Sequence, residues 1–141
     1  MAKVSKMSEW SLLYLRLVLG VIFIYHGYVK LFVPGGFPNT VKFFASVGIP
    51  FAGYSALVTA VAELAGGILL LAGVLTFYSS LVLMFDMAVA FFYVQMKNGI
   101  DVSRFGFEYV LVLFVALLVI VMNNAGEYAL GKMMTKNKHF H

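Results

Sequence analysis

The sequence predicts an all-α integral membrane protein, a four-helix transmembrane bundle with a short interfacial or re-entrant helix between the first and second spans. The first observation is composition: the 141 residues are 62% hydrophobic and 11% charged, whereas soluble domains average about 45–50% apolar and about 25% charged residues. The second is that residues 64–96 carry one charge, Asp86, and residues 109–126 carry none. Uncharged runs of this length indicate membrane spans, because so small a soluble domain could not bury this much apolar surface.

We expect one domain, residues 1–141, with the first apolar segment retained as a span. Lys3 and Lys6 precede that segment as in a secretory signal, but no small-residue cleavage site follows its apolar core. A tight turn is predicted at 76–79, between the second and third spans. The predicted spans are 11–33, 51–75, 77–96 and 107–122, followed by a basic tail at 127–141.

Residues 37–50 predict the short helix, with Asn39 or Thr40 as its N-cap. At about 12 residues it cannot cross a bilayer, so we expect it to lie at the interface or to fold back between helices.

The distribution of lysine and arginine predicts the topology. Four spans place both termini on one side, and basic residues favour the cytoplasmic side of a membrane. The terminal side holds more of them than the opposite side: Lys3, Lys6, Lys132, Lys136 and Lys138 against Lys42, Lys97 and Arg104. We therefore expect cytoplasmic termini.

Six ionisable residues fall inside or at the edge of the predicted spans: Arg16, His26, Lys30, Glu63, Asp86 and Glu108. A charge at the bilayer centre costs at least about 2.5–3.5 kcal/mol, so such side chains usually face a protein interior or a wet cavity. We expect them to form a polar or ligand-binding core, with His26 and Glu63 in a polar cavity inside the bundle that opens to at least one membrane face.

Approximate depths along the spans suggest partners for these groups. They place Glu63 and Asp86 within reach of Arg16, and Glu108 at the level of Lys30 and His26. Two readings remain open. The buried pairs either fix helix register or line a functional site, and His26 is either a core histidine or a group that handles protons or ligand.

Small residues mark the expected helix contacts, because they let two backbones approach closely. The glycines expected to act in this way are Gly20, Gly27, Gly66, Gly67 and Gly73.

Composition also excludes several kinds of site. The chain has no cysteine, which rules out disulfides, iron–sulfur clusters and thiolate metal sites within it. His26 is the one histidine within a predicted span, so one chain cannot supply two histidine ligands to a membrane haem. No metal site is predicted. The net charge of +4 lies mostly in the two tails and indicates topology rather than nucleic-acid binding.

Several motifs together resemble the DoxX family, also described as DoxX/DoxD-like. The first span carries Arg16, Gly20, His26-Gly27 and Lys30-Leu31-Phe32 in the pattern R-x3-G-x5-HG-x2-KLF. The other matching elements follow in order: Gly35-Gly36-Phe37, Phe43-Phe44, Gly48-Ile49-Pro50, Glu63-x2-Gly66-Gly67, Gly73 and Glu108. The resemblance covers about Arg16 to Leu130 and implies a four-helix protein of the prokaryotic cytoplasmic membrane.

The resemblance also implies a role as a membrane subunit of a redox-associated system, quinone-linked or thiosulfate- and sulfur-linked. Quinone is then the candidate cofactor, and a redox partner protein or a second copy of the chain are candidate partners beside the lipid bilayer. This chain is not expected to transfer electrons by itself, because it lacks cysteine, a flavin motif and a second intramembrane histidine. The alternative is a non-enzymatic transporter-like or assembly-factor protein that binds a small anion, a lipid or a partner helix.

Overall fold

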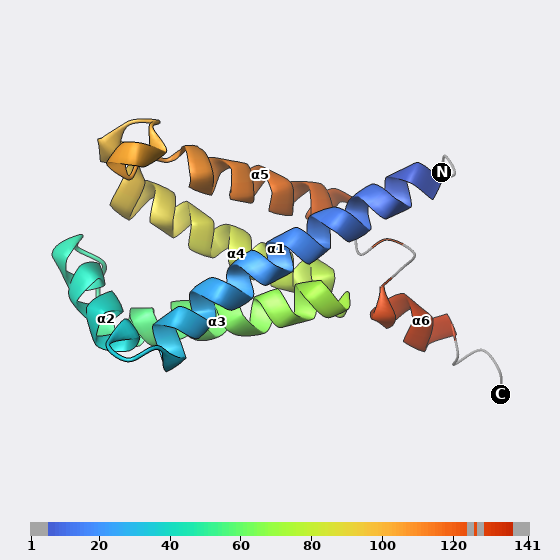
Figure 1. Cartoon of the computed structure of the whole chain (residues 1–141), viewed down its shortest axis with the longest axis horizontal. Coiled ribbons are helices and arrows are strands. Elements are labelled where there is room, and N and C mark those ends of the chain that lie inside the picture. The colour runs from blue at the N-terminus through green and yellow to red at the C-terminus, as the bar shows by residue number, and fades with distance from the viewer. Residues whose placement is uncertain (1–5, 124–125, 127–128, 137–141) are drawn as a thin grey trace.

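The computed structural model describes residues 6–123, 126 and 129–136, and it contains helices and no strand over those residues. Four helices make up the body: α1 (Lys6–Phe32), α3 (Ala52–Ala72), α4 (Thr76–Val89) and α5 (Glu108–Asn123). The short helices α2 (Gly36–Ser46) and α6 (Leu130–Lys136) lie at opposite ends of that body (Figure 1). The all-α prediction is confirmed.

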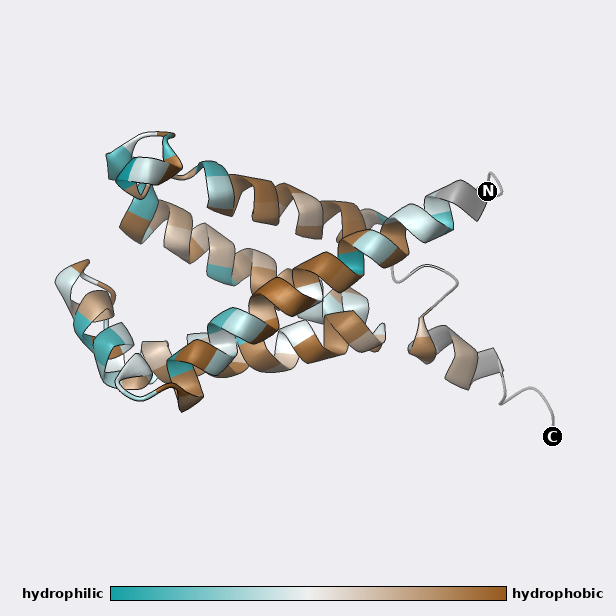
Figure 2. Cartoon of the chain, in the orientation of Figure 1, coloured by the Kyte–Doolittle hydropathy of each residue, from teal (hydrophilic) through white to brown (hydrophobic). Residues whose placement is uncertain are grey.

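Three helical segments are long and apolar enough to cross a membrane: Ser8–Phe32, Ala52–Ala72 and Thr76–Asn98. Helix α5 is apolar but has only 16 residues. Figure 2 shows that hydrophobic residues dominate these helices, while hydrophilic residues gather in the loop before α5 and α2 is mixed.

Helices α1 and α3 pack closely because glycines line their contact. A Cβ atom at Gly27 would lie 2.5 Å from the backbone nitrogen of Leu64, and one at Gly67 would lie 2.7 Å from the nitrogen of Ile24. At Gly20 the same atom would lie 3.0 Å from the carbonyl oxygen of Gly67. No larger side chain fits without separating the two backbones.

The turn between α3 and α4 lies earlier than the sequence suggested. Gly73 ends α3 in the left-handed conformation, with φ 74°, and its N–H donates to Leu70 O at 3.2 Å. Leu75, with φ 49°, is then the N-cap of α4. The predicted turn at 76–79 is therefore wrong. Gly73 caps the C-terminus of α3, and Thr76–Ser79 form the first turn of α4.

Helix α2 also begins earlier than predicted. Gly35 is its N-cap, in the left-handed conformation with φ 78°. The prediction of a cap at Asn39 or Thr40 is wrong: both lie inside the helix, and the Thr40 hydroxyl donates to Gly36 O at 2.8 Å. A glycine can adopt the conformation that this sharp turn after α1 requires.

The segment after α4 continues as a π-helix, η1 (Ala90–Gln95), and a 3-10 turn, η2 (Met96–Asn98). The loop that follows holds a second 3-10 turn, η3 (Val102–Arg104), in which the Ser103 N–H donates to Asp101 Oδ1 at 2.9 Å. This hydrogen bond lowers the pKa of the exposed Asp101 carboxyl.

Part of the predicted basic tail is helical, since residues 130–136 form α6. The Gly131 N–H donates to Gly73 O at 3.2 Å, which ties this segment to the end of α3. Residues 127–128 and 137–141 lie outside the described residues, as do Lys3 and Lys138.

The hydrophobic core lies between the four long helices. It is built from all four long helices, and Leu70, Leu83 and Leu117 are fully buried in it. Its other members include Leu19, Phe23, Met87, Val110, Leu113 and Ile120.

Replacing Gly27 by alanine tests the close contact between α1 and α3. We expect a loss of about 1–3 kcal/mol in unfolding free energy, since the new methyl group meets the Leu64 backbone. Thermal unfolding in detergent measures the effect. Gly53→Ala is the matched control, because no atom beyond its own turn of helix lies within 4 Å of a Cβ at that position. Equal stability of the two variants would contradict this packing.

Candidate functional site

The site begins with an ion pair between α1 and α3. Lys30 Nζ donates to Glu63 Oε2. The Glu63 side chain is 5% exposed and that of Lys30 is 20% exposed. The pair forms because Gly27 packs on Leu64, so Lys30, about one turn after Gly27, comes beside Glu63.

Asp86 joins the pair from α4. The Thr59 hydroxyl, one turn before Glu63 on α3, donates to Asp86 Oδ1 at 3.1 Å. Asp86, Glu63 and Lys30 line the same cavity. We call Lys30, Glu63 and Asp86 the charged cluster.

Two carboxyl groups share one ammonium group in the charged cluster. An isolated charge taken out of water is strongly unfavourable, so the cluster is balanced when one more positive charge joins it. A proton or a cation can supply that charge. Over the described residues, no set of three or more histidine, cysteine, aspartate or glutamate side chains is placed to hold a metal ion.

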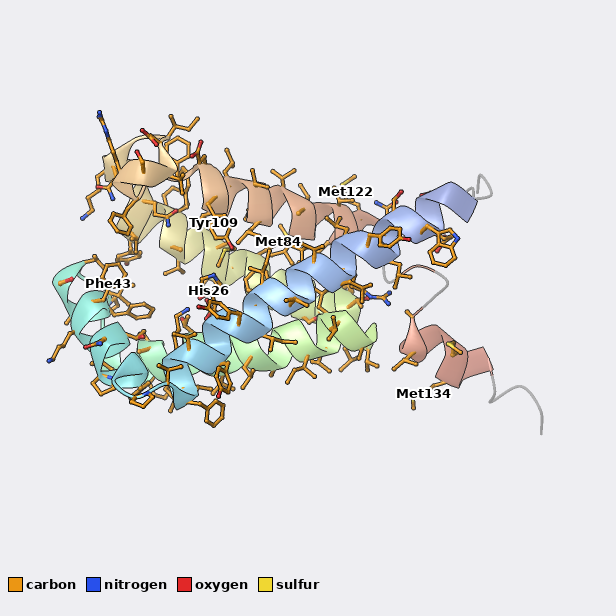
Figure 3. All side chains as sticks on the ribbon, viewed as in Figure 1. His26, Phe43, Met84, Tyr109, Met122 and Met134 are labelled. Carbon is orange, nitrogen blue, oxygen red and sulfur yellow. The ribbon has the colours of Figure 1, made fainter. Side chains whose placement is uncertain are left out.

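The charged cluster lines a cavity of about 870 Å³. Helix α2 forms one wall, with Phe43 and Phe44, and the π-helical end of α4 forms another, with Val94 and Gln95. Figure 3 shows Phe43 on the side of α2 that faces the end of α4. The cavity therefore has apolar and aromatic walls and a polar floor made of Thr59 and the charged cluster.

The cavity lies at the end of the bundle remote from the N-terminus of α1. Lys97, Asn98 and Phe105, which follow α4, and Asn39 of α2 also line it. On the opposite side of the charged cluster, the core residues Leu70 and Leu83 are fully buried. Among the described residues, the cavity thus has polar groups such as Lys97 and Asn98 at the end away from the core. The packed apolar core lies beyond its floor.

The prediction that Arg16 contacts Glu63 and Asp86 is wrong. A Cβ atom at Gly73 would lie 2.9 Å from Arg16 Cζ and 2.9 Å from Ala129 Cα, so the guanidinium group lies at the α3–α4 turn. The helix depths estimated from the span boundaries placed Arg16 too close to Glu63. Lys30 is the basic residue of α1 at the level of Glu63.

The expected contact of Glu108 with Lys30 or His26 is also not formed. Glu108 Oε1 accepts a hydrogen bond from the Val102 N–H at 2.8 Å. The Glu108 carboxylate thus finds its hydrogen-bond partner within the loop before α5. Lys30 is paired with Glu63 instead.

His26 lies beside the charged cluster and is half-buried. Its ring centroid is 6.5 Å from that of Tyr109 and 5.7 Å from that of Tyr25. Figure 3 shows His26 and Tyr109 in the space between α1 and α5. The histidine therefore packs among aromatic rings, one turn before Lys30.

The two remaining glycines serve different contacts. A Cβ atom at Gly66 would lie 3.1 Å from the Leu83 side chain, so this residue lets α4 approach α3. Gly73 ends α3 in the left-handed conformation and makes room for Arg16 and Ala129.

Sequence reasoning did not assign a site role to Thr59, Phe43 or Gln95. Thr59 precedes Glu63 by four residues, so helical spacing places both on one face and could have identified it. Phe43 and Gln95 carry no such signal, because their positions depend on how α2 and the π-helix lie across the cavity.

The chain matches one protein family and one named relative. The model of the DoxX family matches residues 11–96, which is more than half of the chain. The chain is 39% identical over 72 residues to a Bacillus subtilis (strain 168) protein named "Putative oxidoreductase CatD". This alignment covers 51% of the chain and 50% of that relative. No solved structure matches the chain significantly.

Removing Lys30 tests the ion pair. We expect Lys30→Met to lower the unfolding free energy by about 3–5 kcal/mol, because it leaves buried carboxyl groups without their cation. Adding Glu63→Gln should restore part of the loss. Unfolding of the two single variants and the double variant in detergent measures the coupling.

Glu108→Gln is the matched control, since the glutamine side-chain oxygen can still accept the Val102 N–H. We expect a loss below about 1 kcal/mol for this substitution. Strictly additive effects of Lys30→Met and Glu63→Gln would contradict the pairing.

Proposed function

The chain belongs to the DoxX family, and we propose that it is a proton-handling membrane subunit of a redox-associated, quinone-linked complex. One observation carries the proposal: Lys30, Glu63 and Asp86 meet at the floor of a cavity. Intramembrane ionisable groups of this kind commonly mark proton or substrate paths. The name of the Bacillus subtilis relative supports the redox association.

The chain's own part is to bind ligand and to hold or move protons. The chain contains no cysteine, so we assign electron transfer to a partner protein. Glu63 and Asp86 would hold a proton beside Lys30, and the cavity would exchange it with one side of the membrane.

The residues that line the cavity fit a quinone head group. Phe43 and Phe44 offer faces for a ring. The Lys30 ammonium group has N–H donors beyond the one that Glu63 engages, and a protonated Glu63 or Asp86 can donate to a quinone oxygen atom. A bound quinone supplies two-electron, two-proton redox chemistry. A volume of about 870 Å³ lies within the range of known ligand sites.

The proposed topology has four spans, with α5 as the fourth and both termini in the cytoplasm of a prokaryotic cell. The N-terminus of α1 and the end of α5 lie at the same end of the bundle in Figure 1, which supports an even number of crossings. The excess of lysine near the termini gives the orientation. The cavity then opens toward the outer face.

Cysteine labelling tests the topology without interference, because the chain has no cysteine. We expect an impermeant thiol reagent to label Ser103→Cys in intact cells, since Ser103 lies in the exposed loop before α5. Lys138→Cys should react only after the cells are made permeable. Labelling of Lys138→Cys in intact cells would refute the orientation.

Replacing Glu63 tests the functional assignment. We expect quinone to be extracted from the purified wild-type protein at a level above that of a protein-free detergent sample. Glu63→Gln should retain about tenfold less, because the charged cluster loses one of its hydrogen-bonding carboxyl groups. Quinone per protein is measured by lipid extraction, and a melting curve shows that the variant is folded.

Glu108→Gln is again the control, because Glu108 is bound within the loop before α5. It should retain quinone as the wild type does. Absence of quinone from the wild-type protein would instead favour a non-enzymatic bundle that binds a small anion, a lipid or a partner helix.

A further inference from the structure

We propose that the cavity at the charged cluster binds a lipophilic organic cation, with its ammonium group at Asp86 and Glu63. This inference goes beyond the proposed redox role and does not depend on it. It rests on the charge of the cavity floor and on the aromatic walls above it.

The floor of the cavity holds two carboxyl groups and one ammonium group, so one more positive charge is needed to neutralise it. The Lys30 ammonium group is engaged by Glu63, and the Thr59 hydroxyl is engaged by Asp86. Two ionised carboxylates beside one ammonium group leave a net negative charge on the buried Glu63 and the half-buried Asp86, and such a charge is unfavourable until it is paired. An ammonium ion beside Asp86 makes the group neutral.

The walls fit the rest of such a ligand. Phe43 and Phe44 line the cavity from α2, and Phe105 lines it from the loop before α5. Cations are attracted to the faces of aromatic rings. Val47, Ile49 and Met87 add apolar surface for a hydrocarbon body.

Other ligand charges fit less well. A small oxyanion would meet two carboxyl groups, while the nearby ammonium group is already paired. Lys97 lies on the polar end of the cavity, but it is exposed, and solvent and salt screen its charge there. Charge complementarity therefore favours a cation over an anion or a neutral alcohol.

Three probes of one shape test the proposal: 1-naphthylmethylammonium, 1-naphthylmethanol and 1-naphthoate. We expect the purified protein in detergent to bind the ammonium probe about tenfold more tightly than the alcohol, and the carboxylate most weakly. Equilibrium dialysis against protein-free micelles gives the binding due to protein.

Asp86→Asn should remove the preference for the ammonium probe, and its amide oxygen can still accept the Thr59 hydroxyl. Glu108→Gln removes a carboxylate outside the cavity and should leave the preference unchanged. Phe43→Leu keeps the charged cluster and should weaken ammonium binding by about three- to tenfold. This variant tests the site even if Asp86→Asn does not fold.

Equal binding of the ammonium probe and the alcohol would overturn the proposal, as would an equal loss of preference in Asp86→Asn and Glu108→Gln. Unchanged ammonium binding by Phe43→Leu would also overturn the assignment to this cavity. Quinone retention is a separate measurement, so a failure of cation binding is distinguishable from a failure of the redox role.

Discussion

The contact between α1 and α3 positions the rest of the site. Gly27 against Leu64 and Gly67 against Ile24 bring the two backbones together. Lys30 follows Gly27 by three residues and Glu63 precedes Leu64 by one, so the same contact sets the distance between the ammonium and carboxyl groups. A wider spacing would leave both charges without their partner, which is why packing and electrostatics are coupled here.

The bundle is divided into two halves with different tasks. Near the termini, apolar side chains such as Leu70, Leu83 and Leu117 are fully buried and hold the four helices together. At the other end, α2 packs on α1 and α3, and a cavity separates it from the end of α4. The packed half can keep the charged cluster in position, while the open half gives a ligand or proton access to it.

The two proposals have one physical origin, the unequal number of acids and cations at Lys30, Glu63 and Asp86. A proton shared by the two acids balances the charge and leaves the cavity suited to a neutral ring. An ammonium ligand balances the same charge by direct contact. The π-helix at Ala90–Gln95 contributes to the wall of this cavity, and such segments in helices are frequent at functional sites.

The sequence by itself determined the helical class and the presence of membrane-crossing segments, because hydrophobic run length and sparse charge are local properties of the chain. It also identified the residues of the cluster, since Lys30, Glu63 and Asp86 are conspicuous within apolar runs. Their partners were decided only by tertiary structure. Helix depths estimated from span boundaries paired Arg16 with Glu63, whereas the glycine contact between α1 and α3 brings Lys30 there and leaves Arg16 beside Gly73. The buried acids indicated a polar cavity, and Glu63 does line one. The walls of that cavity were not readable from the sequence, because they depend on how α2 and the π-helix lie across the bundle, and no periodicity in the chain encodes that arrangement.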